Sequence, residues 1–214
     1  MSVGYRIAAL MLLPILVTVG VGAGQSGPPV YLPSAEGADG ALLDGGVWVV
    51  ENRLYEARLF PIDEESRRQF LLEYAGTDVD PFHTRGANSP DFITFVLDLE
   101  VRGEGMLILQ PQRCRLITNK LEFRYPLDMP TIESAYTLME GRMPEAYRKV
   151  EPALLDGERT LRAGDRLRGL LVYEGIDVKT KTFTVEVQMT SGAGEVEGFT
   201  AAYAREKKKK KKKK

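Results

Sequence analysis

Two carboxylates and an imidazole lie close together in the chain and have the chemistry to bind a divalent cation. They are Asp78, Asp80 and His83, in the segment 78–83 with the sequence DVDPFH. Carboxylate oxygens and imidazole nitrogens are ordinary metal ligands. A calcium loop, however, supplies more oxygens and a downstream Glu at fixed spacing, and Asp-Pro commonly opens a surface turn. The segment therefore supports two hypotheses, a metal-binding loop and a plain surface loop.

The residues that nucleophilic catalysis requires are scarce in this sequence. Cys114 is the only Cys and His83 is the only His, which excludes an intrachain disulfide and a multi-histidine metal site. Cys114 stands between Arg113 and Arg115 in an expected strand, where we predict a half-buried structural thiol. Two neighbouring arginines lower the pKa of an exposed thiol, but a catalytic thiol also needs a base. The sequence has no Gly-x-Ser-x-Gly motif. We predict no catalytic residues, no cofactor and no enzymatic activity.

The formal net charge of -1 combines segments of very different charge. Eight of the 29 basic residues form one C-terminal run, Lys207, Lys208, Lys209, Lys210, Lys211, Lys212, Lys213 and Lys214. This run cannot bury its side chains and repels itself, so we predict a disordered basic tail over residues 205–214. Lysines beside an anionic surface each contribute up to about 1 kcal/mol of binding at low salt. The run either holds the protein on such a surface, has no selected role, or is an engineered addition.

The N-terminus has the pattern of a signal peptide. Arg6 precedes the uncharged apolar run 7–21, and Val21-Gly22-Ala23 fits the small-x-small cleavage pattern. An apolar run of this length suits a signal peptide better than a membrane-spanning helix, which needs about 20 residues. We predict a cleaved signal peptide at 1–23 and a flexible leader at 24–46, which is rich in Gly, Pro and Ser. The mature chain is then periplasmic or secreted, without a transmembrane span; the alternative is an uncleaved inner-membrane anchor.

Period-two alternation of apolar and polar residues dominates the body between residues 47 and 204. It is clearest at 93–101 and 182–189, and it places apolar side chains on one face of a strand. Further strands are expected at 47–50, 55–60, 106–110, 113–118, 121–125, 167–173 and 198–203. The turn sequence Arg102-Gly103-Glu104-Gly105 predicts a hairpin between the strands on either side of it. Such short strands predict a mainly β fold, an antiparallel β-sandwich.

Short helices are expected in the long connections between these strands. Pro61 and the acids after it open one, with apolar residues at helical spacing and Gly76 to close it. A second is predicted at 131–140, and Pro144 begins another short turn. The fold class is therefore mainly β, with two or three short helices in the connections.

An ordered series of strands and turns carries a family resemblance. The series comprises residues 95–101, 106–110, 113–118, 121–128 and the stretch LRAGDRLRGLLVY at 161–173. It resembles bacterial exported immunoglobulin-like β-sandwich domains of unknown function. The chain departs from their pattern at Ala163, where they usually have Pro, and at Tyr173, where they usually have Phe. The resemblance implies an immunoglobulin-like sandwich over 47–204 that serves as a structural or binding module, not a catalyst.

These features predict an exported, non-catalytic interaction or structural module of the bacterial cell envelope. The alternative is a ligand- or metal-binding envelope protein that uses the 78–83 loop. Without Arg6 and the lysine run, the basic residues fall from 29 to 20 against 30 acidic residues. This acidic body, together with the signal peptide, argues against nucleic acid as a partner. The expected partner is another envelope protein or an anionic envelope surface.

Overall fold

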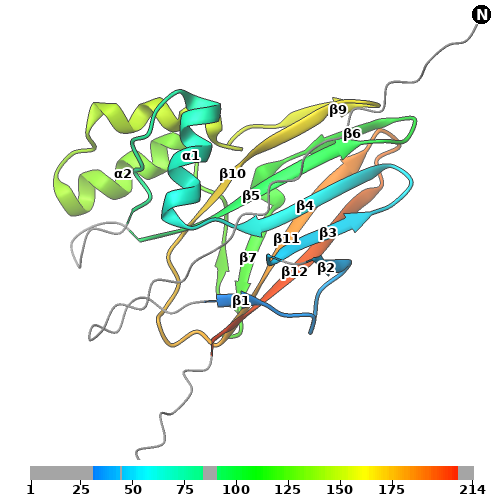
Figure 1. Cartoon of the computed structure of the whole chain (residues 1–214), viewed down its shortest axis with the longest axis horizontal. Coiled ribbons are helices and arrows are strands. Elements are labelled where there is room, and N and C mark those ends of the chain that lie inside the picture. The colour runs from blue at the N-terminus through cyan, green and yellow to red at the C-terminus, as the bar shows by residue number, and fades with distance from the viewer. Residues whose placement is uncertain (1–30, 44, 84–90, 207–214) are drawn as a thin grey trace, which may run out of the picture.

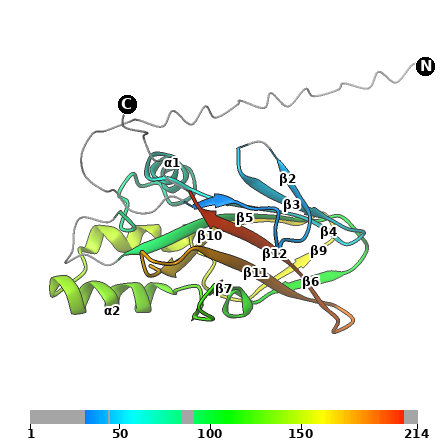
Figure 2. The same cartoon turned by 90° about the horizontal axis from the view of Figure 1, so that it is seen from below.

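The computed structural model describes residues 31–43, 45–83 and 91–206. Within these ranges two antiparallel β-sheets face each other, and the longer helices gather at one end of them (Figures 1 and 2). Sheet A contains, in spatial order, β1 (Tyr31–Pro33), β12 (Val196–Arg205), β11 (Thr182–Ser191), β6 (Met106–Leu109) and β9 (Arg159–Arg162). Beside β6, strand β7 (Arg115–Thr118) pairs with β11 and with β8 (Phe123–Arg124). Sheet B contains β10 (Arg166–Glu174), β5 (Phe92–Val101), β4 (Tyr55–Pro61), β3 (Val47–Glu51) and β2 (Ala41–Leu43).

The main hydrophobic core lies between the two sheets. Alternate residues of β5, including Phe95, Leu97 and Leu99, point inward and are completely buried. They meet the inward residues of β11, such as Val185 and Val187, as the period-two pattern predicts. The prediction of a mainly β fold with antiparallel sheets and short helices is confirmed.

A second core forms where helices cover the outer face of sheet B. Helix α1 (Glu64–Ala75), helix α2 (Met129–Glu140) and the 3-10 helix η2 (Glu145–Ala153) supply most of it. They pack on Phe92, Val96, Leu170 and Val172 of β5 and β10. The alternation in β5 predicted that its second face would be polar and outward. That prediction is wrong for Thr94 and Val96, which are buried because the helices cover this half of the strand.

The two α-helices begin and end where local capping chemistry directs. The Asp63 side chain accepts a hydrogen bond from Ser66 N at 2.8 Å, and Gly76 closes α1 in the left-handed region with φ of 65°. The Asp128 side chain accepts from Thr131 N at 2.9 Å at the start of α2. The predicted helices at 61–76 and 131–140 are thus confirmed within a few residues. A short 3-10 helix, η1 (Pro111–Arg113), precedes β7.

The predicted hairpin between β5 and β6 does not form, because the two strands lie in different sheets. β5 pairs with β4 and β10, whereas β6 pairs with β9 and β11. The turn between them crosses the sandwich and is held by Arg102 N and Gly103 N, which both donate to Leu54 O. A Cβ at Gly103 would lie 2.3 Å from Arg53 O, so glycine is needed for a close backbone approach and not for a hairpin turn.

The predicted flexible leader at 24–46 is corrected from residue 31 onward. β1 pairs with β12, with Tyr31 opposite Arg205, and β2 pairs with β3. These three-residue strands carry no usable alternation, and their position depends on partners contributed by other parts of the chain. The predicted signal peptide and residues 207–214 of the predicted tail lie outside the described residues. Within residues 31–43, 45–83 and 91–206, no helix has the length and apolar character needed to cross a membrane.

Candidate functional site

Asp80 of the predicted metal loop forms an ion pair with a buried arginine, Arg67. Arg67 Nη2 lies 2.6 Å from Asp80 Oδ2, and Arg67 Nε donates to both carboxylate oxygens at 2.9 Å. Phe82 N donates to Asp80 Oδ1 at 2.9 Å, and Arg67 Nη1 donates to Thr94 Oγ1 at 3.0 Å. Both charged side chains are buried, with 8% of Arg67 and 0% of Asp80 exposed. The carboxylate therefore fixes α1 against the loop and sheet B.

The other two predicted ligands lie apart from that carboxylate. His83 Nδ1 is 2.6 Å from Glu64 Oε2 at the start of α1, and the Asp78 side chain is exposed. Among the residues with described positions, no group of three or more His, Cys, Asp and Glu side chains is arranged to hold a metal ion. The structure thus does not bring Asp78, Asp80 and His83 together as a ligand set.

Cys114 lies in the main core, immediately before β7. Its side chain is completely buried, not half-buried as expected from the sequence. Burial raises the pKa of the thiol to about 12, partly offset by a backbone hydrogen bond from Gln188. The flanking arginines leave the core, and Arg115 pairs with Glu186. A protonated, inaccessible thiol has no nucleophilic role.

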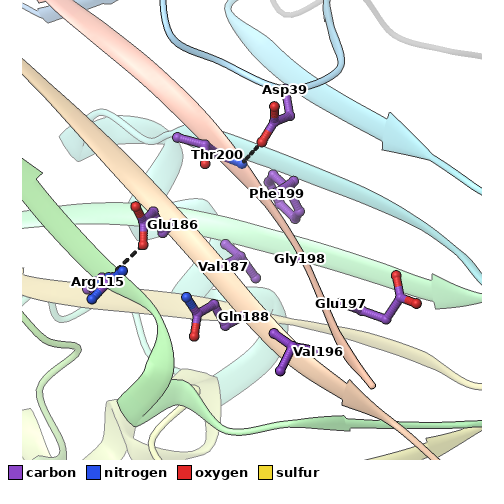
Figure 3. Close-up of a pocket in the computed structure, with 10 residues that line it drawn as sticks. All are labelled: Asp39, Arg115, Glu186, Val187, Gln188, Val196, Glu197, Gly198, Phe199 and Thr200. Atoms are coloured by element: carbon purple, nitrogen blue, oxygen red, sulfur yellow. Dashed lines mark hydrogen bonds and ion pairs between the residues drawn. The ribbon is translucent and has the colours of Figure 1, made fainter. Parts of the chain in front are cut away.

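The outer face of sheet A is the best candidate for an interaction site. The three longer helices pack on sheet B and leave this face uncovered by them (Figure 2). One depression of about 300 Å³ lies over β11 and β12, and its lining includes Asp39, Arg115, Glu186, Gln188, Glu197 and Thr200 (Figure 3). A second, of about 360 Å³, lies further along the same strands, lined among others by Ser34, Glu36, Ile117, Thr182, Thr184 and Ala204. We call these two depressions the sheet A trough.

Carboxylates outnumber cations in the sheet A trough. Among the described residues that line it, the one basic side chain is that of Arg115, whose Nε lies 2.5 Å from Glu186 Oε2. Asp39 and Glu36 are exposed. Glu197 precedes Gly198 on β12, so its side chain points to the opposite face, where it accepts a weak hydrogen bond from Asn52 Nδ2 at 3.4 Å. With Glu186 paired to Arg115, the carboxylates of Asp39 and Glu36 give the trough a negative potential.

Short side chains on β12 keep the floor of the trough low. Gly198, Thr200 and Ala202 follow one another at every second position of the strand. At Gly198 a Cβ would lie 2.4 Å from Val187 O, so the strand accepts only glycine there. Asp39 joins the trough because its Oδ2 accepts from Thr200 N at 3.1 Å and its own N–H donates to Thr200 O at 2.8 Å. A ligand can therefore approach the backbone of β12 closely.

The uncovered part of sheet B carries charges that neutralise one another. Arg166 makes a bidentate pair with Asp98 at 2.9 and 2.8 Å, and Arg58 lies 2.7 Å from Glu56. Arg102 also pairs with Glu56. The depression among these side chains holds only about 120 Å³. This face thus has less capacity for a charged ligand than the sheet A trough.

Sequence reasoning identified part of the trough and missed the rest. The outward residues of β11 were correctly predicted as its polar face. Asp39, however, lies in the segment predicted to be a flexible leader, and only pairing with β12 brings it into the same depression as Glu186. The predicted surface-binding residues Lys207 to Lys214 lie outside the described residues. No protein-family model, no curated protein and no solved structure matches the chain.

Proposed function

We propose that the protein is an exported, non-catalytic interaction module of the bacterial cell envelope, built as an immunoglobulin-like β-sandwich. In this proposal the sheet A trough binds an extended, basic segment of another envelope protein. The observation that carries the proposal is the uncovered trough, which holds the exposed carboxylates of Asp39 and Glu36 while its Arg115 is paired with Glu186. The signal-peptide pattern at residues 1–23 supports export, and the buried, protonated Cys114 supports a role without catalysis.

The shape and charge of the trough favour an extended segment as the occupant. The trough follows β11 and β12, each ten residues long. At about 3.3 Å per residue, a peptide of about ten residues in extended conformation has the length of these strands. Lysine or arginine side chains of such a peptide face the carboxylates of Asp39 and Glu36. Opposite charge speeds the encounter and selects basic partners over acidic ones.

A defined basic peptide tests this proposal. We expect a labelled peptide of alternating lysine and glycine, about ten residues long, to bind the full chain with an affinity that falls as salt rises. The double variant Glu36→Gln and Asp39→Asn should bind it about tenfold more weakly, as measured by fluorescence anisotropy. The matched control is Glu73→Gln and Glu145→Gln, two exposed acids of the helical region. It removes the same net charge away from the trough and should change the affinity less than about twofold.

Two outcomes overturn the proposal. An equal loss of affinity in the two double variants means that the peptide senses only net charge and not the trough. A gain of about tenfold on deletion of residues 207–214 means that the lysine run of this chain occupies the trough in place of a partner protein. Circular dichroism and thermal unfolding of each variant establish that the fold is retained.

A further inference from the structure

Two turns lie side by side at one end of the sandwich. One joins β7 to β8 over residues 119–122, and the other joins β10 to β11 over residues 175–181. Asn119 N donates to Thr182 O at 2.9 Å, and Asn119 Oδ1 accepts from Lys181 N at 3.0 Å. Lys120 Nζ lies 2.6 Å from Asp177 Oδ2 and links the two turns through their side chains. The turns therefore form one surface.

Each turn presents an exposed apolar side chain among basic ones. Leu121 is 75% exposed and occupies the left-handed region with φ of 60°, and Val178 is 61% exposed. The basic side chains around them are those of Lys120, Lys179, Lys181 and Arg205, all exposed. The acids nearby are Asp177, which is paired with Lys120, Glu122, which lies 3.6 Å from Arg124 Nη2, and Glu206. We call this surface, from Leu121 and Val178 to the four basic residues, the basic end.

The terminal segments join the body at the same place. β1 lies beside the end of β12 (Figure 1), with Tyr31 opposite Arg205. The Tyr31 hydroxyl donates to Thr180 O at 3.0 Å. Arg205 N donates to Lys181 O, and Arg205 Nη1 donates to Val178 O at 2.7 Å. The chain beyond Tyr31 leads to the apolar run 7–21, and the chain beyond Arg205 leads to the lysine run. The described part of the chain therefore begins and ends at the basic end.

We propose that the basic end docks on an anionic lipid membrane. Leu121 and Val178 enter the boundary between headgroups and acyl chains, and the basic side chains contact lipid phosphates. An apolar contact and a cluster of positive charge are the two signals that together give stable membrane binding. The acidic remainder of the body is repelled by the same surface. This inference rests on the export part of the proposed function and does not involve the trough.

Tryptophan placed at the tip of one turn tests the contact directly. The native Trp48 is 1% exposed, so it supplies a constant background in every variant. We compare the full chain carrying Val178→Trp with a control carrying Val196→Trp, which is 67% exposed in the wild type and lies at the other end of β12. The vesicles are phosphatidylcholine with brominated chains, either alone or with about 30% phosphatidylglycerol. Bromine quenches tryptophan fluorescence only where the side chain reaches the acyl region.

The expected result is quenching of the residue-178 tryptophan on anionic vesicles at least about twofold stronger than that of the residue-196 tryptophan. Equal quenching at both positions, or equal quenching on neutral and anionic vesicles, overturns the proposal. In the second case the apolar N-terminal segment alone accounts for attachment. If the residue-178 tryptophan is not quenched but the basic peptide still binds the trough, the membrane proposal fails and the proposed function stands.

A charge-reversal pair tests the electrostatic part without altering a turn tip. Lys179→Glu with Lys181→Glu should weaken binding of the full chain to anionic vesicles by at least about tenfold in a flotation assay at low salt. The matched control is Arg142→Glu with Lys149→Glu, two exposed basic residues in the helical region. The same loss in both pairs indicates a response to net charge only and contradicts docking through the basic end. Strong binding of the wild type to RNA at the same salt concentration, with no binding to the vesicles, assigns the basic end to nucleic acid instead.

Discussion

Arg67 and Asp80 join helix α1 to the loop that follows it by an ion pair of 2.6 Å that is almost completely buried. The remaining hydrogen bonds of the pair reach Thr94 on β5 and Phe82 N in the loop. One guanidinium thus connects the helix, the loop and the outer face of sheet B. The pair fixes the position of α1 on the second core and occupies the Asp80 carboxylate with the Arg67 guanidinium.

Removing one partner of this pair should strongly destabilise the fold. Asp80→Asn leaves the buried guanidinium of Arg67 without a counter-charge, so we expect the free energy of unfolding to fall by about 3–5 kcal/mol. The double variant Arg67→Met with Asp80→Leu removes both charges and should recover most of this loss. Urea unfolding followed by circular dichroism measures the difference. Glu64→Gln, which breaks the exposed pair with Arg68, should cost less than about 1 kcal/mol.

A loss of less than about 1 kcal/mol in Asp80→Asn contradicts this prediction and indicates that water reaches the guanidinium. The same variant also bears on the metal hypothesis. If Asp78, Asp80 and His83 bound a cation, calcium or zinc would raise the melting temperature of the wild type and leave that of Asp80→Asn unchanged. The geometry of the Arg67 pair leads us to expect no metal-dependent shift in either protein.

The sequence pattern predicts individual strands well and their partners poorly. Alternation in β5 and β11 is local information, because each strand must place apolar residues on the face toward the core. Whether the opposite face is buried depends on tertiary packing. Val96 is buried because helices distant in the sequence pack on it, which the alternation within β5 does not reveal. The turn at Arg102 to Gly105 has hairpin chemistry, yet its close contact with Arg53 and Leu54 directs the chain into the other sheet.

The functional surfaces were even less accessible to sequence reasoning. The trough needs Glu36 and Asp39 beside β12, and the basic end needs Leu121 beside Val178. Each set comes from segments that only the pairing of β1, β7, β11 and β12 brings together. The individual residues are ordinary surface polar or turn residues, so their types and spacing carry no signal. The lysine run is the exception, because its chemistry is visible from composition alone.

The burial of Cys114 predicts a specific loss of stability at alkaline pH. The thiol has a pKa of about 12 in the folded chain and an ordinary value of 9.0, so above pH 9 the unfolded chain loses a proton that the folded chain keeps. The unfolded state is then favoured as pH rises. Between pH 9 and 10 this group should lower the free energy of unfolding by about 1 kcal/mol. Cys114→Ala leaves a cavity whose cost does not change with pH. The free energy of unfolding of this variant, measured with urea, should therefore fall less between pH 9 and 10 than that of the wild type.

Thiol labelling gives an independent check on the same residue. At pH 8 a thiol reagent should leave native Cys114 unmodified and should label it fully in denaturant. The control, Ala193→Cys, places a second thiol in the exposed β11–β12 turn, and this one should react in the native state. Rapid labelling of native wild-type protein contradicts the buried position.

Removing two different tyrosine hydroxyls should have opposite effects on the stability of the fold. Tyr203 is 1% exposed, and its hydroxyl has no hydrogen-bond partner among the residues that the structure describes. We expect Tyr203→Phe to leave stability unchanged or to raise it by about 1 kcal/mol, because it removes a buried polar atom that gains nothing. The Tyr55 hydroxyl donates to Gly198 O at 3.3 Å, so Tyr55→Phe should cost about 1 kcal/mol. If urea unfolding shows that both variants lose the same free energy of unfolding, the difference in hydrogen bonding between the two hydroxyls is contradicted.

Export by a cleaved signal peptide makes a prediction about the N-terminus of the exported chain. Signal peptidase requires small side chains at the first and third positions before the cut, which Ala23 and Val21 supply in this sequence. Intact mass measurement of exported protein should therefore give a chain that begins at Gly24. Ala23→Arg should block processing and leave the chain in the membrane fraction, whereas Gln25→Arg, beyond the cut, should be processed. A wild-type chain that retains residues 1–23 contradicts cleavage and favours the uncleaved anchor, in which case the apolar run joins the basic end in holding the protein on the membrane.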